Sequence, residues 1–391
     1  MDSSRLKKFK KLAKLMNQQS TTYALPMKSM YKIFDLMLTT EETDFLLHMG
    51  KSFYTRRELE SHSGLPAEEF SSMLDGLIRK GIIFTDQEEG QELVFFLSPI
   101  LPGWFEMILC GGGETPRHQE FSGLLDDYFN EARALNFFPL RSFMNLFFRR
   151  DGAHRTVAVI VPEKKRKKAG KKKVIDVQKE IPAAPMTVYP KKNVRELIEK
   201  YGSEENIALV HCFCRLRKKR AGDPCEFDIP IESCIVLGRF SNHIAKYGFG
   251  KKITKQEAHE VMDRVEKKGA LHQVFYVREK IGEPEIAICN CCRDCCEVFR
   301  LYYRGITPLV IRSFYIARIA EGDTCNGCGL CVKPCPVQAI TIADDMAIIN
   351  EPFCIGCGQC ALKCTRDAVE LEYSERDVFL PTLKKSEARI T

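Results

Sequence analysis

Eight cysteines near the carboxyl end of the chain share one repeated spacing. In order, the two runs are Cys325-x2-Cys328-x2-Cys331-x3-Cys335-Pro336 and Cys354-x2-Cys357-x2-Cys360-x3-Cys364. Two intervening residues let a turn point three successive thiolates at one site, whereas the fourth thiolate lies too far along the chain to reach that site. This pattern predicts the ligands of two cubane iron–sulfur clusters.

The fourth cysteine of each run is therefore expected to bind the cluster of the other run. The expected ligands of the first 4Fe-4S cluster are Cys325, Cys328, Cys331 and Cys364. The expected ligands of the second are Cys354, Cys357, Cys360 and Cys335. A pair of zinc sites is the alternative, but tandem runs with a crossing fourth cysteine are rare for zinc.

Glycines inside both runs, Gly327 and Gly356 among them, keep the loops free of Cβ atoms and let backbone N–H groups approach a cluster. With these motifs, residues 305–378 resemble the bacterial-type dicluster ferredoxins. The resemblance implies a two-fold ferredoxin-like fold in which residues 339–342 and 368–371 form strands. Thr365 stands where that family usually has proline after the second run.

A second group of cysteines lies upstream, within about 85 residues. Its nine members are Cys212, Cys214, Cys225, Cys234, Cys289, Cys291, Cys292, Cys295 and Cys296. Thiolates at such short spacings chelate soft metals, so we expect one or two further metal sites. Iron–sulfur clusters are the preferred occupants, and zinc is the alternative. For one extra cubane, the candidate ligands are Cys212, Cys214, Cys225, Cys234, Cys291, Cys292 and Cys295. Two clusters would need eight of the nine; structural zinc and a redox-active or catalytic cysteine pair are the alternatives.

Two segments of this region, residues 211–215 (HCFCR) and 289–296 (CNCCRDCC), carry a second, looser resemblance. They are similar to motifs in cytoplasmic iron–sulfur proteins of anaerobic bacteria and archaea. That resemblance implies electron transfer, without a defined reaction.

The elements around these cysteines follow from local patterns. Residues 207–214 alternate like a strand, which would place Cys212 and Cys214 on one face. Thr254 and Glu257 form a capping box for a helix that runs to residue 268. Residues 271–277 and 285–289 then predict a hairpin that leads into the CNCCRDCC segment.

The N-terminal part predicts a winged helix over residues 39–101. Helices are expected over 41–49, 55–62 and 67–80, and a hairpin over 81–85 and 92–97 around a wing at 87–90. The third helix would enter a DNA groove, yet it exposes Glu68, Glu69 and Asp75. Since acidic side chains repel phosphates, DNA binding is disfavoured, and a docking or structural role is preferred.

The net charge of +7 is concentrated in residues 5–14 and 164–173. Residues 5–16 fit a basic amphipathic helix that could dock on an anionic membrane or an acidic partner, although a solvated, partly ordered terminus is favoured. Residues 117–149 predict helix and 156–161 a strand. The basic run 163–173 is interpreted as a solvated loop. The alternative is a docking patch for an acidic electron carrier.

Composition indicates the cellular compartment and the solubility of the protein. The chain has 391 residues and 18 cysteines, which are grouped in metal-type spacings rather than as a disulfide framework. Without a recognisable signal peptide, we expect a reducing, anaerobic cytoplasm. The most apolar stretch, residues 94–110, is interrupted by Pro99, Pro102 and Glu106, so we expect a soluble or peripheral protein with no membrane span.

The expected fold class is multidomain α+β: an N-terminal winged helix, a Cys-rich α/β middle domain and a C-terminal ferredoxin-like dicluster domain. The expected boundaries are 1–20 for a basic segment, 30–113 for the winged helix, 114–190 for a helical connector, 191–304 for the Cys-rich domain and 305–391 for the ferredoxin domain.

The chain contains no phosphate-binding loop, no Rossmann glycine fingerprint and no Ser–His–Asp set at a recognisable spacing. We therefore expect an electron-transfer protein or subunit that relays low-potential electrons through the ferredoxin clusters and the further Cys-ligated centre to a partner redox enzyme. The alternatives are a redox-sensing winged-helix transcriptional regulator and an oxidoreductase with an open-site cluster.

Overall fold

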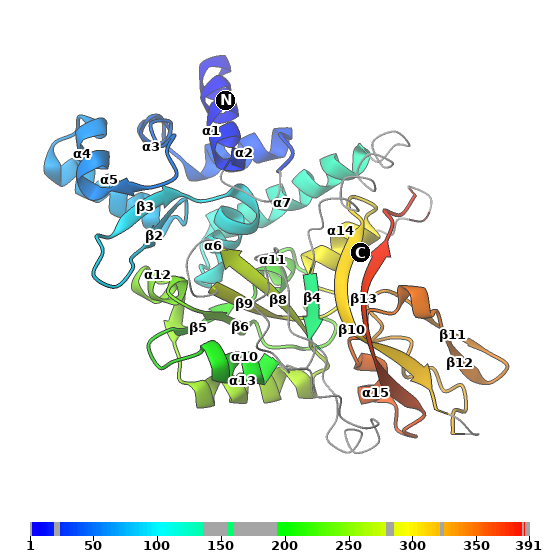
Figure 1. Ribbon diagram of the computed structural model, residues 1–391. Helices are drawn as coiled ribbons and strands as arrows, with labels where there is room; N and C mark the ends of the chain where they lie inside the picture. The colour runs from blue at the N-terminus through cyan, green and yellow to red at the C-terminus, as the bar shows by residue number, and fades with distance from the viewer. Residues whose placement is uncertain are drawn as a thin grey trace. The chain divides into compact units, whose positions relative to one another are not determined.

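The computed structural model in Figure 1 combines helices and sheets and describes residues 2–18, 24–135, 155–158, 194–278, 285–320, 324–384 and 387. The chain divides into two compact units, and each is made of segments that are separated in the sequence. The first unit contains Met1–Ala134, Glu204–Pro224 and Arg239–Ile253. The second contains Leu135–Ser203, Cys225–Gly238 and Thr254–Thr391.

The first unit is mainly helical. Its helices are α1 (Ser3–Gln18), α2 (Lys28–Met37), α3 (Thr40–Leu46), α4 (Arg56–Ser63), α5 (Ala67–Arg79), η1 (Ile100–Trp104), α6 (Phe105–Cys110), α7 (Pro116–Ala134), α11 (Phe213–Arg220) and α12 (Phe240–Lys246). Its strands are β1 (Tyr54–Thr55), β2 (Ile83–Asp86), β3 (Val94–Leu97), β5 (Ile207–His211) and β7 (Gly250–Lys252).

Three helices and a small antiparallel sheet occupy the region where a winged helix is expected. The sheet has the order β1-β3-β2, and α3, α4 and α5 precede its hairpin. Thr39 and Thr55 each begin a helix with a reciprocal capping box, which satisfies two backbone N–H groups at each helix start. On α5, Glu68, Glu69 and Asp75 are exposed, so the acidic face expected there is present.

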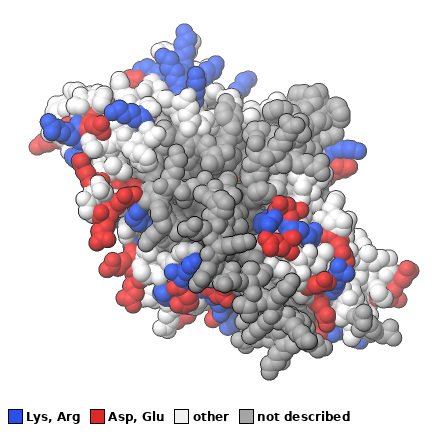
Figure 2. Space-filling model, viewed as in Figure 1, with Lys and Arg blue, Asp and Glu red and all other residues white. Residues whose placement is uncertain are grey.

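The N-terminal helix α1 is packed into the first unit. Phe9, Leu12, Ala13 and Met16 are buried on one face, against α2, α3 and η1. Its Lys and Arg side chains gather on the outer surface of the helix, as Figure 2 shows. The expectation of a solvated, partly ordered terminus is therefore wrong for residues 3–18, because this apolar face contributes to the core.

The second unit is built on strands β4 (Arg155–Ala158), β6 (Glu232–Leu237), β8 (Leu271–Arg278), β9 (Glu285–Cys291), β10 (Leu309–Ile319) and β13 (Val369–Leu380), with a separate hairpin of β11 (Ile340–Ala343) and β12 (Met346–Ile349). Six of these strands form a sheet in the order β13-β10-β4-β8-β9-β6. The pair β10 and β4 is parallel, whereas the other neighbours are antiparallel. The helices are α10 (Val194–Tyr201), α13 (Lys255–Lys267), α14 (Glu297–Tyr303), η2 (Glu351–Phe353) and α15 (Gln359–Lys363).

One hydrophobic core joins the two cysteine-rich parts of the second unit. Phe299 and Tyr303 of α14 pack together with Ile355 of the second ferredoxin cysteine run. The Gln359 side chain donates to the backbone oxygen of Ala270 at 3.0 Å, which ties α15 to the chain before β8. The ferredoxin segment is thus not an appendage of this unit but part of its core.

Several expectations concern residues beyond the described ranges. They are the basic run 163–173, the last part of the helix expected over 117–149 and the end of the strand expected over 156–161. Within the described ranges, no helix is both long enough and apolar enough to cross a membrane.

Candidate metal centres

The eight cysteines of the C-terminal runs line two separate hollows. Four of them, Cys325, Cys328, Cys331 and Cys364, line the first hollow. The other four, Cys335, Cys354, Cys357 and Cys360, line the second hollow. In each hollow, three cysteines come from one run and the fourth from the other run. This arrangement is the one that crossed ligation of two clusters requires.

Close backbone approaches keep both cysteine loops in shape. At Gly356 the backbone φ is +63°, and a Cβ atom would lie 2.0 Å from the backbone oxygen of Tyr315. At Gly327 the φ is +64°, and a Cβ atom would meet the backbone of Asp345 at 2.7 Å. Only glycine combines this left-handed conformation with so little space, so both turns depend on it.

The two hollows differ in exposure to solvent. In the first hollow, Cys328 is exposed and Cys325 and Cys364 are half-buried. In the second hollow, all four cysteines are buried. A group in the first hollow is therefore closer to any partner in solution than a group in the second.

Backbone N–H groups point at several of these sulfurs. Ala368 donates to Cys364 at 3.2 Å, and Ala339 donates to Cys335 at 3.3 Å. Such bonds stabilise sulfur that carries negative charge. They are the outer-shell partners expected around a thiolate-ligated cluster.

Burial has the opposite effect on the thiols of the second hollow. It raises the pKa of Cys335 and Cys357, and it raises the pKa of Cys360 to about 12. By contrast, N–H groups of Gly327 and Ala347 lower the pKa of the more exposed Cys325. A bound cation would favour the thiolate forms of these three cysteines.

An exposed apolar surface adjoins the first hollow. Leu330 and Ile342 line this hollow and are also exposed, and Met346 and Ile348 are exposed on β12. Asp344 and Asp345, both exposed, form the turn between β11 and β12. We call these four apolar residues the hairpin patch. The patch is an apolar surface, and Asp344 and Asp345 form an acidic edge beside it.

The nine upstream cysteines are divided between the two units. Cys212 and Cys214 belong to the first unit, and the other seven belong to the second. The strand expected over 207–214 ends at His211, and α11 begins at Phe213 with Cys212 as its N-cap. Cys212 and Cys214 therefore do not share a strand face, and that expectation is wrong.

The helix replaces the strand because the sequence after Cys212 suits a helix. The four residues Arg217–Arg220 place positive charge in its last turn, where it complements the helix dipole. The fully buried Arg217 forms an ion pair with Asp126 of α7 at 2.8 Å. His211, at the strand end, lies with Nδ1 3.1 Å from the backbone oxygen of Cys110.

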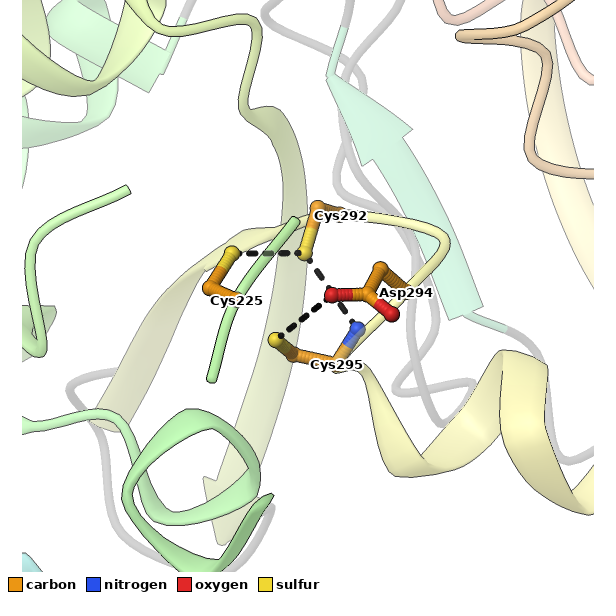
Figure 3. Close-up of side chains that lie close together, drawn as sticks. All are labelled: Cys225, Cys292, Asp294 and Cys295. Carbon is orange, nitrogen blue, oxygen red and sulfur yellow. Dashed lines mark hydrogen bonds between the residues drawn. The ribbon is translucent and has the colours of Figure 1, made fainter. Parts of the chain in front are cut away.

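Three of the seven remaining cysteines meet around one carboxylate. The Sγ atoms of Cys225, Cys292 and Cys295 and a carboxylate oxygen of Asp294 all lie within 4.8 Å of one another (Figure 3). Among the described residues, no other group of three or more such side chains is so compact. Asp294 was not among the expected ligands; its position inside the Cys292-x-x-Cys295 segment was the available signal.

Contacts within this group shift the pKa values of Cys225 and Cys295 in opposite directions. Contacts with Cys292 and Cys295 lower the pKa of Cys225, whereas its neighbours Cys225 and Cys292 raise the pKa of Cys295. One negative charge is thus readily held, but several thiolates this close need a cation between them.

A second, looser group consists of Cys289, Cys291 and Cys296. Hydrogen bonds with Cys289 and Cys296, together with burial, raise the pKa of Cys291. The Gln273 side chain also donates to the Cys296 sulfur at 3.4 Å. The expected hairpin is present here, because β8 and β9 pair antiparallel with Gln273 opposite Cys289. Cys234 lies apart from both groups in sequence, on β6.

Comparisons with known proteins support a ferredoxin domain near the carboxyl end of the chain. The family model of the 4Fe-4S dicluster domain matches residues 324–369. The ferredoxin-type protein NapF of Haemophilus influenzae is 41% identical over 61 residues, which are 14% of this chain and 29% of that protein. The chain therefore spans less than a third of this relative's length. No solved structure matches.

Residues 324–369 are thus a 4Fe-4S dicluster ferredoxin domain, and the ferredoxin resemblance is confirmed over that range. The match and the cysteines around it support iron–sulfur clusters as cofactors. Neither comparison supports a winged helix, so the winged helix over residues 39–101 stays a prediction.

Proposed function

We propose that the protein transfers single electrons through two 4Fe-4S clusters to or from a separate redox protein. The observation that carries this proposal is the pair of hollows, each lined by three cysteines of one run and one cysteine of the other. In this assignment, Cys325, Cys328, Cys331 and Cys364 bind the first cluster. Cys354, Cys357, Cys360 and Cys335 bind the second.

The bound clusters would supply the one-electron chemistry. The surrounding chain would determine which cluster a partner can reach and the reduction potential of each cluster. The more exposed first hollow suits exchange with a partner in solution, whereas the buried second hollow suits storage or relay inside the unit. The second hollow shares its hydrophobic core with Cys291 and Cys296. Burial of charge and N–H···S bonds tune cluster potentials, so the different surroundings predict different potentials for the two clusters.

The hairpin patch is the part of this unit that fits a redox partner. Its apolar side chains lie beside the exposed cluster position, and its edge carries Asp344 and Asp345. Apolar contact centres with a charged rim are typical of protein interfaces. We therefore propose a partner protein with an apolar centre and a basic rim, in preference to a small-molecule substrate.

Single cysteine variants test the crossed ligand sets. The four variants are Cys328→Ser, Cys364→Ser, Cys357→Ser and Cys335→Ser. If ligation crosses, the Cys364 variant alters the same reduced-cluster EPR signal as the Cys328 variant, and the Cys335 variant alters the same signal as the Cys357 variant. Cys110→Ala is the control, because Cys110 is buried in the first unit, away from both runs in sequence.

The opposite grouping would overturn the assignment. If Cys364→Ser changed the signal shared by the Cys354 run, each run would complete its own cluster. Full retention of both signals in all four variants would show that these cysteines are not ligands.

A further inference from the structure

The compact group of Cys225, Cys292, Asp294 and Cys295 has the dimensions of a site for one metal ion. A tetrahedral ion with metal–sulfur bonds of about 2.3 Å holds its sulfurs about 3.8 Å apart. The Sγ atoms of Cys225 and Cys292 are separated by 3.8 Å. All four ligand atoms lie within 4.8 Å of one another. A single ion fits between atoms this close, whereas a cubane does not.

The ferredoxin cysteines provide an internal comparison. Each thiolate of a cubane binds a different iron at a different corner, so its ligands must stand apart around a sizeable inorganic core. The eight C-terminal cysteines line two hollows, with four cysteines around each. Within the described ranges, no three of their cysteines approach one another as closely as the upstream group does. One chain thus presents two different cysteine geometries.

Local hydrogen bonds hold the four ligand atoms in place. The backbone N–H of Cys295 donates to the Cys292 sulfur at 3.3 Å across a tight Cys-x-x-Cys turn. The backbone N–H of Glu226 donates to Asp294 Oδ2 at 2.8 Å, which joins the Cys225 segment to the turn. Figure 3 shows Cys225 facing the turn from a separate stretch of chain. Outer-shell bonds of this kind orient ligands before the metal arrives.

We propose that Cys225, Cys292, Cys295 and Asp294 bind one zinc ion in a tetrahedral Cys3Asp site. Three thiolates and one carboxylate match the ligand types and the number that zinc takes in closed sites. Zinc has no redox chemistry, so the site would clamp the Cys225 segment to the turn that precedes α14. The proposal rests on this geometry and not on the electron-transfer proposal.

Metal and sulfide analysis of the full chain, purified without oxygen, tests the site. The wild-type protein is expected to contain about one zinc in addition to the iron and acid-labile sulfide of its clusters. Cys292→Ala is expected to lose about one zinc per chain and to keep its acid-labile sulfide. Cys110→Ala, a buried cysteine of the other unit, is expected to keep both.

Variants of Asp294 keep the test valid if Cys292→Ala fails to fold. Zinc-edge X-ray absorption should give three sulfur neighbours and one oxygen neighbour in the wild type, and four sulfurs in Asp294→Cys. Asp294→Asn should release zinc to a chelator about tenfold faster or more. Joint loss of iron and sulfide in Cys292→Ala, or wild-type protein without zinc, would overturn the proposal.

Discussion

His243 links the stability of the first unit to pH. Its ring stacks on Phe240 and Phe249, and its Nδ1 accepts the backbone N–H of Thr85 at 3.1 Å. The side chain is 3% exposed, and burial together with the charge of Lys246 lowers its pKa to about 3. The unfolded chain binds a proton below pH 6.5, whereas the folded chain does not until about pH 3.

The free energy of unfolding should therefore fall as the pH drops below 6.5, by about 1.4 kcal/mol at pH 5.5. His243→Phe keeps a stacked ring but removes the titration, so its stability should change less between pH 7.5 and 5.5. Urea unfolding followed by fluorescence of Trp104 measures this, because the only tryptophan in the chain is buried in the same unit. Equal pH dependence in the two proteins would contradict the prediction.

At the same scale, the two groups of cysteines show what spacing can predict. In the C-terminal runs, tight turns bring the sulfurs together, and the cysteines that line each hollow are those that the spacing groups as proposed ligands of one cluster. Among the nine upstream cysteines, the grouping depends on which strand pairs with which and on the turn at Cys292. Cys225 joins the group from 67 residues away, and Asp294 joins it as a carboxylate. Sequence spacing carries no information on the contact that Cys225 makes across this separation.

Among the elements, α1 should contribute to the stability of the first unit, because its apolar face is packed inside that unit. Phe9 is fully buried and makes an edge contact with Phe34, their ring centres 5.7 Å apart. Phe9→Ala should therefore lower the free energy of unfolding by about 3–5 kcal/mol. Lys11→Ala, on the exposed face of the same helix, should change it by less than about 0.5 kcal/mol. Urea denaturation compares the two variants, and similar values for both would show that the helix is not packed.

The amphipathic pattern of residues 5–16 predicted this helix but not what covers it. An apolar stripe opposite lysines fits a membrane surface and a protein core equally well. The buried contacts with α2 and α3 decide between them, because the apolar stripe is already occupied.

The β11–β12 hairpin should govern the rate of electron exchange with a basic partner. Ile348→Lys places a positive charge in the hairpin patch, where Ile348 is 52% exposed. The rate of electron transfer to cytochrome c, a basic haem protein, should fall about fivefold or more at low ionic strength. Reduction of the clusters by dithionite should be unchanged, since this small ion needs no docking surface.

Phe53→Lys is the matched control, because Phe53 is 45% exposed in the first unit, outside the ferredoxin domain. Its rate with cytochrome c should stay near that of the wild type. Equal slowing in the two variants would mean that the added charge acts through the net charge of the protein and not through docking.

At the scale of the whole molecule, the chain passes between its two units more than once. The segments Glu204–Pro224 and Arg239–Ile253 belong to the first unit, although their neighbours on both sides belong to the second. Domain boundaries predicted from sequence divide a chain into consecutive pieces. They do not indicate when a later segment packs into an earlier unit. The ferredoxin domain was predictable because its ligands, loops and strands lie within 50 consecutive residues or so.

This organisation places both cluster positions and the proposed zinc site in one unit. The ferredoxin cysteines share a hydrophobic core with α14, which begins directly after Cys295 and Cys296. Loss of zinc should therefore loosen the Cys225 segment and the turn that precedes α14, while the clusters stay in place. Faster amide hydrogen exchange of these two segments in Asp294→Asn than in the wild type, with unchanged cluster absorbance, is the expected result, and equal exchange in the two proteins would contradict it.

The central claim is that the chain carries two redox-active 4Fe-4S clusters. An anaerobic redox titration of the full chain, followed by EPR, tests it most directly. The account predicts two one-electron reductions per chain at low potential, with about eight irons and eight acid-labile sulfides for the two hollows. Zinc in place of iron at the eight C-terminal cysteines, or clusters that accept no electron from a low-potential donor, would contradict it.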